Sequence, residues 1–202
     1  MKPNHFNGKL IAFDGPNGVG KTTLIKKVYD ALSKNGISTY TTKEPTSSAL
    51  GIFAKEIAKT LSGDALACLV AADRYDHMMN DIIPYLRNGY VVLLDRYVLS
   101  SLILQRMDQV DVDFILAVNQ NILAPDLQVA VEASVAVIEE RLMRRNPETL
   151  TRWEQGRTEE EISFLREGAS ILKDFGISTL MIDNTENLEN NVTTIINVIN
   201  KV

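Results

Sequence analysis

The chain has 202 residues, 45% of them hydrophobic, and a formal net charge of −5, which suits one compact domain over residues 1–202 and disfavours general binding to nucleic acid. No apolar run approaches the ~20 residues of a membrane span, and the polar N-terminus lacks a signal-peptide core, so we expect no membrane association. The single cysteine, Cys68, excludes an internal disulfide and favours a cytoplasmic location; we expect it to be buried in a helix.

The first motif lies at residues 13–23, which read FDGPNGVGKTT. It follows an apolar run, Lys9–Phe13, and precedes a helical pattern from about Gly20 to Lys34. A glycine-rich turn between a strand and a helix, with this spacing, is typical of a phosphate-binding P-loop. The residues predicted to bind ATP are Gly15, Asn17, Gly18, Val19, Gly20, Lys21, Thr22 and Thr23.

Four further expectations concern the phosphates and Mg²⁺. Lys21 would reach the β- and γ-phosphates, and the Thr22 hydroxyl would bind Mg²⁺. Asp95 ends an apolar run, as a Walker B carboxylate does, and would orient the same ion directly or through water. Arg96 follows at once and would place a guanidinium beside the phosphate. The chain is therefore predicted to bind a nucleoside triphosphate together with Mg²⁺.

Five short apolar runs alternate with helical patterns, which indicates a three-layer α/β fold: a five-stranded parallel sheet with helices on both faces. The strands are predicted at Lys9–Phe13, Ser38–Thr42, Tyr90–Leu94, Leu127–Val131 and Thr179–Ile182. The helices are expected at about 20–34, 49–61, 65–87, 98–106, 112–123, 135–145, 159–175 and 188–199. Ligands of such sheets bind at the carboxyl ends of the strands, where the motifs described above lie.

Two basic residues outside the P-loop have open interpretations. Pro45 keeps Glu44 out of the helical region, so Lys43 is held at a strand end and either faces the cleft or is a solvated surface lysine. Arg74 shares a helix face with apolar neighbours and either reaches into a pocket or lies over its own helix. His77 has no second histidine or cysteine at metal spacing, so we expect no metal role for it.

Basic residues also gather in and after the helix that follows the fourth strand. They are Arg141, Arg144, Arg145, Arg152 and Arg157. This cluster is either a solvated helix C-terminus, which the helix dipole favours, or a short lid at about 144–158 that closes over the phosphates.

Several motifs together resemble the thymidylate kinase family, from about Lys9 to Ile182. They are, in chain order, the P-loop, Lys43-Glu44-Pro45 with Leu50-Gly51, Ala72-Asp73-Arg74, Asp95-Arg96-Tyr97 with Ser100-Ser101 and Gln105, Pro125-Asp126-Leu127, and Arg152-Trp153-Glu154. The resemblance implies the P-loop NTPase fold and ATP- and Mg²⁺-dependent phosphorylation of a nucleoside monophosphate, with dTMP, which gives dTDP, as the first candidate. It also implies a cytoplasmic homodimer.

The resemblance assigns individual roles as well. Arg96 would contact the acceptor phosphate, and Arg74 and Ser101 would stand where the base is recognised. One lid arginine would steady the transferring phosphoryl group: Arg144, Arg145, Arg152 or Arg157, of which Arg152 is the catalytic candidate. Gly18 stands where some members carry an arginine, so the lid must supply that cation. The implied acceptor site comprises Asn17, Lys43, Val70, Arg74, Arg96, Ser101, Leu104 and Gln105.

Four of these positions depart from the family pattern. Asn17 replaces a carboxylate that receives the sugar 3′-hydroxyl, and Lys43 replaces an arginine. Val70 stands where an aromatic ring stacks on thymine, and Leu104 stands where many members have a tyrosine. The departures leave two alternatives open: harmless divergence in a thymidylate kinase, or a kinase with a changed acceptor, such as a ribonucleotide or a modified pyrimidine nucleotide.

Two other classes of nucleotide-binding protein are alternatives to a kinase. A GTPase-type switch would need a guanine-reading Asn-Lys-x-Asp segment, and the sequence contains none. A non-catalytic nucleotide-binding protein is permitted by the substituted acceptor site, but the intact P-loop and the Asp95-Arg96 pair argue against it.

Overall fold

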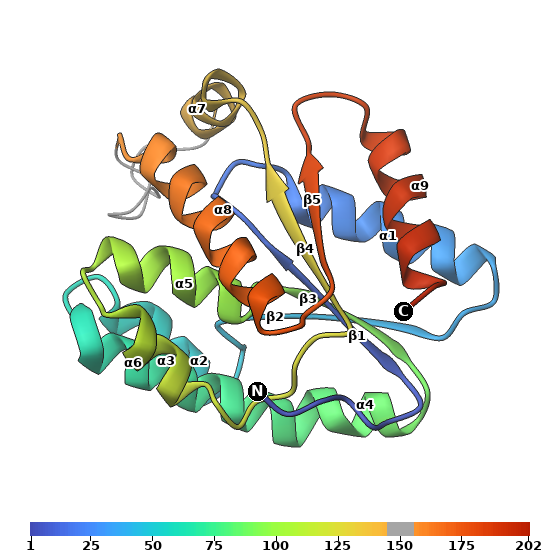
Figure 1. Cartoon of the computed structure of the whole chain (residues 1–202), viewed down its shortest axis with the longest axis horizontal. Coiled ribbons are helices and arrows are strands. Elements are labelled where there is room, and N and C mark those ends of the chain that lie inside the picture. The colour runs from blue at the N-terminus through green and yellow to red at the C-terminus, as the bar shows by residue number, and fades with distance from the viewer. Residues whose placement is uncertain (145–155) are drawn as a thin grey trace.

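A parallel five-stranded sheet in the order β2-β3-β1-β4-β5 forms the centre of the computed structural model, which describes residues 1–144 and 156–202. Helices cover both faces of the sheet (Figure 1). The strands are β1 (Lys9–Asp14), β2 (Thr39–Lys43), β3 (Val91–Asp95), β4 (Leu127–Glu132) and β5 (Thr179–Asp183). The predicted α/β class, the five strands and their parallel pairing are confirmed.

Each strand ends one residue later than its apolar run predicts. Asp95 at the end of β3, for example, is paired with Phe13 of β1 and Lys43 of β2. Strand length is set by backbone hydrogen bonds to neighbours rather than by side-chain hydrophobicity, so polar residues are included wherever a neighbour continues. The consequence is that acidic side chains stand at the carboxyl edge of the sheet.

The helices follow the predicted order with several changed boundaries. They are α1 (Lys21–Lys34), α2 (Ala49–Ile57), α3 (Gly63–His77), the π-helical η1 (Met78–Ile82), α4 (Ile83–Arg87), α5 (Val98–Met107), α6 (Val112–Val118), α7 (Val135–Met143), α8 (Thr158–Asp174) and α9 (Leu188–Ile199). None of these helices is long and apolar enough to cross a bilayer.

Three sequence expectations about these helices are wrong. The single helix expected over 65–87 is three consecutive segments, because a π-helical stretch interrupts it before Pro84. The helix expected over 112–123 ends at Val118, and within it only Ile115 is fully buried. Cys68 is exposed rather than buried, because α3 turns the neighbouring Ala67 and Ala71 inward and leaves residue 68 on the opposite side.

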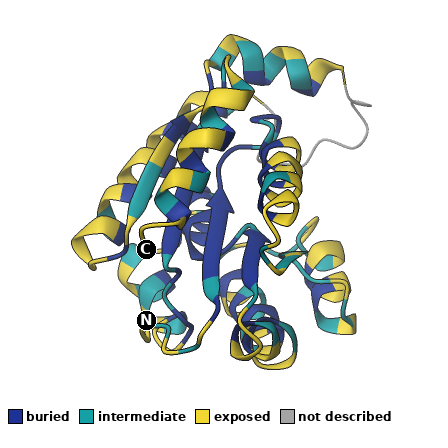
Figure 2. Ribbon diagram, turned by 90° about the vertical axis from the view of Figure 1, so that its right-hand side faces the viewer, coloured by how far each residue is buried: buried dark blue, intermediate teal, exposed yellow. Residues whose placement is uncertain are grey.

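Two clusters of buried side chains sit on opposite faces of the sheet. Alternate residues of β1 serve the two clusters: Leu10 and Ala12 pack on the face covered by α5, α8 and η1, whereas Ile11 and Phe13 pack on the face covered by α1, α7 and α9. Figure 2 shows the strands as the buried centre between helices whose outer sides are exposed. Burial on both faces holds the carboxyl ends of β1 and β3 at one rigid edge, from which the site is built.

Candidate active site

The P-loop follows β1 and leads into α1, as the sequence predicts. Its backbone requires glycine at two points in particular. At Gly15 a Cβ atom would lie 2.1 Å from the Val131 carbonyl oxygen, so only glycine allows β4 to pass so closely. At Gly20 the backbone has φ +95° immediately before the helix, a conformation that L side chains rarely adopt. These constraints curl the chain so that α1 begins at the loop.

The side chain of Lys21 extends back across the P-loop. Its Nζ atom donates hydrogen bonds to the carbonyl oxygens of Gly15 and Pro16, each at 2.9 Å. Burial, together with the positive charge of Arg96, lowers the pKa of Lys21 to about 7. Among the described residues, the Lys21 amino group is therefore hydrogen-bonded only to neutral carbonyl groups. A phosphate bound beside it would favour the charged form of Lys21.

Thr22 and Asp95 are brought together although they lie on different elements. The Thr22 hydroxyl donates to Asp95 Oδ2 at 3.1 Å, while the buried Oδ1 atom of Asp95 has no hydrogen-bond partner. A hydroxyl and a carboxylate with a spare oxygen are suitable ligands for Mg²⁺, which binds one or two protein oxygens together with substrate phosphates and waters. No group of three or more His, Cys, Asp or Glu side chains in the described ranges could hold a metal by itself.

Arg96 adopts an unusual backbone conformation at the end of β3, with φ +72°. Its N–H donates to the Phe13 carbonyl oxygen at 2.9 Å, which ties the residue to β1. The half-buried guanidinium donates through Nη1 to Ser100 Oγ at 3.1 Å and through Nη2 to Asn17 Oδ1. Two of the predicted acceptor-site residues, Asn17 and Arg96, are thus in direct contact beside the P-loop.

Asp14 is a residue that the sequence interpretation missed as part of the site. It is completely buried, and its Oδ1 atom accepts from the backbone N–H groups of Tyr97 at 2.8 Å and Ser100 at 2.9 Å and from the Ser100 hydroxyl. Its Oδ2 atom accepts from Gln128 Nε2 at 2.9 Å. The carboxylate therefore caps the first turn of α5. Only the pairing of β1 with β3 brings these residues together, and no local sequence signal indicates it.

Arg74 is buried, with 1% of its surface exposed, so the interpretation in which it lies over its own helix is wrong. Its Nε atom donates to Glu44 Oε2 at 2.7 Å. Its Nη1 atom donates to Ser101 Oγ at 3.1 Å and to Asn119 Oδ1 at 2.7 Å, and Nη2 donates to the Tyr97 carbonyl oxygen at 3.1 Å. Arg74 and Ser101 are thus in contact, and the unpredicted partners Glu44 and Asn119 complete the cluster.

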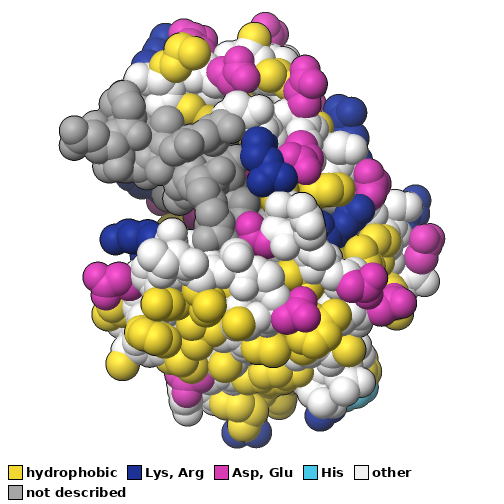
Figure 3. All heavy atoms as spheres, turned by 90° about the vertical axis from the view of Figure 1, so that its left-hand side faces the viewer, with side chains coloured by type: hydrophobic (Ala, Val, Ile, Leu, Met, Phe, Trp, Pro, Cys, Tyr) yellow, Lys and Arg dark blue, Asp and Glu magenta, His cyan; other side chains and the backbone are white. Residues whose placement is uncertain are grey.

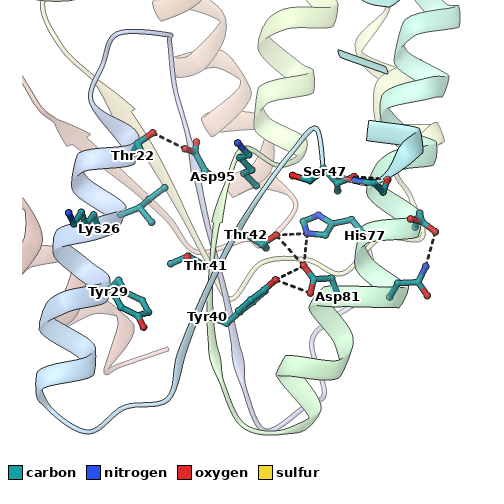
Figure 4. Close-up of a pocket in the computed structure, with 16 residues that line it drawn as sticks. Thr22, Lys26, Tyr29, Tyr40, Thr41, Thr42, Ser47, His77, Asp81 and Asp95 are labelled. Carbon is teal, nitrogen blue, oxygen red and sulfur yellow. Dashed lines mark hydrogen bonds and ion pairs between the residues drawn. The ribbon is translucent and has the colours of Figure 1, made fainter. Parts of the chain in front are cut away.

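Lys43 is exposed at the end of β2. With Thr22 and Asp95 it lines a groove of about 630 Å³ that runs between α1 and the α3–η1 segment, alongside β2. Figure 4 shows Thr22 and Asp95 at one end of this groove and His77 and Asp81 across β2 from α1. His77 is buried and bonds to Thr42 Oγ1 at 2.8 Å.

The remaining predicted acceptor and nucleotide residues occupy varied environments. Val70 and Leu104 are half-buried, Gln105 is buried with an unpartnered Oε1 atom, and Thr23 is exposed. Val19 is buried, and its carbonyl oxygen accepts from Arg141 and Asn184.

The basic cluster is divided by the structure. Arg141 donates to the Val19 carbonyl oxygen of the P-loop at 3.1 Å and to the Asn184 carbonyl oxygen at 3.3 Å. Arg144 pairs with Glu140 on the helix surface. Arg157 donates to Glu160 at 2.6 Å and to the Met107 carbonyl oxygen at 3.1 Å. Arg145, Arg152 and most of the predicted lid lie outside the described residues.

Comparisons with known proteins agree with this geometry. The sequence model of the family described as thymidylate kinase matches residues 13–195. A probable thymidylate kinase of Caldivirga maquilingensis is 37% identical over 140 residues, which cover 67% of this chain and 68% of the relative. A thymidylate kinase of Caldicellulosiruptor saccharolyticus is 37% identical over 143 residues, with coverage of 67% and 69%.

The fold has a counterpart among solved structures. The thymidylate kinase of Candida albicans superposes with a TM-score of 0.76 over 96% of this chain and 92% of that chain, at 21% identity. At this identity the similarity establishes the fold alone, and the predicted P-loop fold is confirmed. The sequence comparison carries the rest: because the family model spans most of the sequence, the chain belongs to the thymidylate kinase family.

Proposed function

We propose that the chain transfers the γ-phosphoryl group of ATP to dTMP and so forms dTDP and ADP. The observation that carries the proposal is the convergence of three elements on the P-loop: Lys21 within it, the Thr22–Asp95 pair beside it, and the Arg96 fork bonded to Asn17. Phosphoryl transfer needs cations around the reacting phosphates and little other chemistry from the protein. The family name of the relatives supports dTMP as the acceptor.

In this mechanism an oxygen atom of the dTMP phosphate attacks the γ-phosphorus in line, and the bond from that phosphorus to the β–γ bridging oxygen breaks. The attacking oxygen is already ionised, so no general base is required. Lys21 would leave the carbonyl groups of Gly15 and Pro16 and follow the γ-phosphate, while Arg96 would hold the acceptor phosphate in line. Thr22 and Asp95 would hold Mg²⁺, which supplies positive charge to the phosphates when bound.

The acceptor would lie on the side of the P-loop that carries Arg96. Asn17 and Lys43 would contact the sugar and the acceptor phosphate, and Ser101, held by Arg74, would face the base. Val70, Leu104 and Gln105 would complete the base pocket. Residues 1–202 would act as one domain whose segment 144–158 closes as a lid, with Arg152 as its cation. Arg152→Ala should then lower kcat without changing the KM for dTMP; equal kcat would exclude Arg152 from catalysis.

The test is ADP release from ATP and Mg²⁺ with a panel of acceptors: dTMP, dUMP, UMP, CMP, dCMP, AMP and GMP. Selective turnover of dTMP is the expected result. Faster turnover of another nucleotide would instead identify a changed acceptor, to which the departures at Asn17, Val70 and Leu104 would be assigned. An absence of turnover with every acceptor, with ATP still bound, would indicate a non-catalytic nucleotide-binding protein.

We also propose that the protein is a homodimer in the cytoplasm. Hydrophobic side chains gather on the lower part of the face shown in Figure 3, on the side where Figure 1 places α2, α3 and α6. Ile52 and Phe53 of α2 are more than half exposed, a pattern that marks protein interaction surfaces. The exposed thiol of Cys68 suits a reducing compartment. Sedimentation should give a dimer that Phe53→Glu converts to monomer; a wild-type monomer at micromolar concentration would contradict the assignment.

A further inference from the structure

The Ser100 hydroxyl makes two hydrogen bonds whose directions are fully determined. One partner is the Asp14 carboxylate and the other is Arg96 Nη1, at 3.1 Å from Ser100 Oγ. A carboxylate only accepts hydrogen bonds, and a guanidinium only donates them. The hydroxyl proton of Ser100 must therefore point toward Asp14, which leaves an oxygen lone pair directed at Arg96.

Asp14 is itself immobilised. It is completely buried and is bonded from the other side by Gln128 Nε2 at 2.9 Å, while the backbone N–H groups of Tyr97 and Ser100 hold its Oδ1 atom. Since Asp14 immediately precedes Gly15, the first residue of the P-loop, this network fixes the first turn of α5 relative to the loop. The Ser100 oxygen is consequently a fixed point for any group that bonds to it.

The charge of Arg96 is left free by this arrangement. Both side-chain acceptors of its guanidinium, Ser100 Oγ and Asn17 Oδ1, are neutral. None of the described acidic side chains forms an ion pair with Arg96. The nearest carboxylate in the network, Asp14, is separated from it by the Ser100 hydroxyl. The positive charge is felt across the loop, since it lowers the pKa of Lys21.

We propose that Ser100, oriented by Asp14, is a positioning residue that aims the Arg96 guanidinium at the acceptor phosphate while leaving its charge unneutralised. The inference rests on the proposed function, in which Arg96 binds that phosphate. A carboxylate in the place of the Ser100 hydroxyl would also orient the Arg96 guanidinium, but it would form an ion pair with it and so compete with the phosphate. A neutral hydroxyl backed by a buried carboxylate gives direction without that competition.

The test is a double-mutant cycle of Ser100→Ala and Arg96→Ala, with kcat and the KM values for dTMP and ATP measured for each variant. Ser100→Ala should lower kcat/KM for dTMP about tenfold, the effect of one charge-assisted hydrogen bond, and leave the KM for ATP within about twofold. In the Arg96→Ala background the same change should have no further effect, because Ser100 acts only through Arg96.

Matched variants separate positioning from stability. Gln128→Met removes the bond to Asp14 Oδ2 but keeps the backbone N–H groups that hold Oδ1, the oxygen that orients Ser100, so it should lower Tm and leave the KM for dTMP unchanged. Ser100→Cys has the same shape with a larger sulfur atom in place of oxygen, and it accepts hydrogen bonds weakly. It should therefore behave like Ser100→Ala even if the alanine variant fails to fold. Ser100→Thr, which keeps the hydroxyl, should restore most of the lost efficiency.

Three outcomes would overturn the inference. The first is wild-type kinetics in both Ser100→Ala and Ser100→Cys. The second is a double variant whose loss of kcat/KM is the product of the losses in Ser100→Ala and Arg96→Ala. The third is a KM for dTMP that rises as much in Gln128→Met as in Ser100→Ala. Wild-type kinetics in Arg96→Ala alone would instead remove Arg96 from the proposed function, and this inference with it. The Arg96 and Ser100 variants thus distinguish the two failures.

Discussion

Arg96 and Arg74 are held in opposite ways within the same half of the molecule. Arg96 is half-buried and bonded by neutral oxygen atoms, so its charge is available to a ligand. Arg74 is 1% exposed, ion-paired with Glu44, and bonded to three further protein groups. The difference teaches that proximity to a nucleotide site does not give two arginines the same task. The charge of Arg96 stays available to a ligand, whereas Arg74 links α3 to α5 and to the residue after β2.

Removing Arg74 is the most direct test of its structural role. Arg74→Met should lower the free energy of unfolding by about 3–5 kcal/mol, because it leaves the buried Glu44 carboxylate without its guanidinium. Urea denaturation measures the loss. The double variant Arg74→Met with Glu44→Gln should recover most of it, since no charge is then left buried. A loss below about 1 kcal/mol in the single variant would show that the pair is not structural.

Removing Arg96 should give the complementary result. Arg96→Ala should lower turnover of dTMP about 10²–10³-fold, the effect of losing one preorganised group that stabilises developing charge. Its unfolding free energy should change by less than about 1 kcal/mol, since the side chain is half-buried and its partners are neutral. Steady-state kinetics and urea denaturation test both parts. Arg96→Lys keeps the charge but loses the two-pronged geometry of the guanidinium, so its turnover should lie between those of the wild type and Arg96→Ala. Turnover equal to that of the wild type would argue against directional binding.

Lys21 extends the comparison to pH. Its pKa of about 7 in the ligand-free protein lies below the usual value of 10.5, and phosphates would favour the charged form. ATP binding at pH 8 should therefore take up close to one proton, and affinity should fall up to tenfold per pH unit above pH 7. Calorimetry in two buffers of different ionisation enthalpy measures the proton uptake. Lys21→Met should take up no proton when it binds ATP. An absence of proton uptake in the wild type would show that the pKa of Lys21 is not near 7.

The same shift has a consequence for the ligand-free chain. Between pH 7 and 10.5 the unfolded state keeps the Lys21 proton that the folded state has lost. The contribution of Lys21 to folding stability therefore rises with pH across this window, and Lys21→Met should remove that slope.

The smallest expected effect lies at Tyr40. Its partner Asp81 is linked to Arg74 through His77, which contacts both Asp81 and Glu44. Tyr40 OH donates to both carboxylate oxygens of Asp81, at 2.9 and 2.8 Å, and its ring stacks on Tyr85. Burial raises the pKa of Tyr40 to about 12, so the hydroxyl remains a donor in ordinary assays. Tyr40→Phe keeps the stack and should cost about 1 kcal/mol in urea denaturation with unchanged kcat. A fall in kcat would mean that the network reaches the phosphates.

Local signals in the sequence account for a large part of the site. The P-loop could be predicted because its glycines and its place between a strand and a helix are constraints within one short segment. Asp95 and Arg96 could be placed beside it because parallel strands bring their carboxyl ends to one edge. The sequence alone thus determined the α/β fold, the order of its strands and helices, and the candidate phosphate-binding residues.

Tertiary structure decided which side chains touch and how deeply they lie. The burial of Arg74 depends on Glu44, Ser101 and Asn119, which come from three other parts of the chain. The burial of Asp14 and the exposure of Cys68 depend on which side of a strand or helix meets a neighbour. Hydrogen bonds between residues tens of positions apart leave no periodic trace in a sequence. For that reason the network that orients Arg96 is visible only once the sheet brings β1 and β3 together.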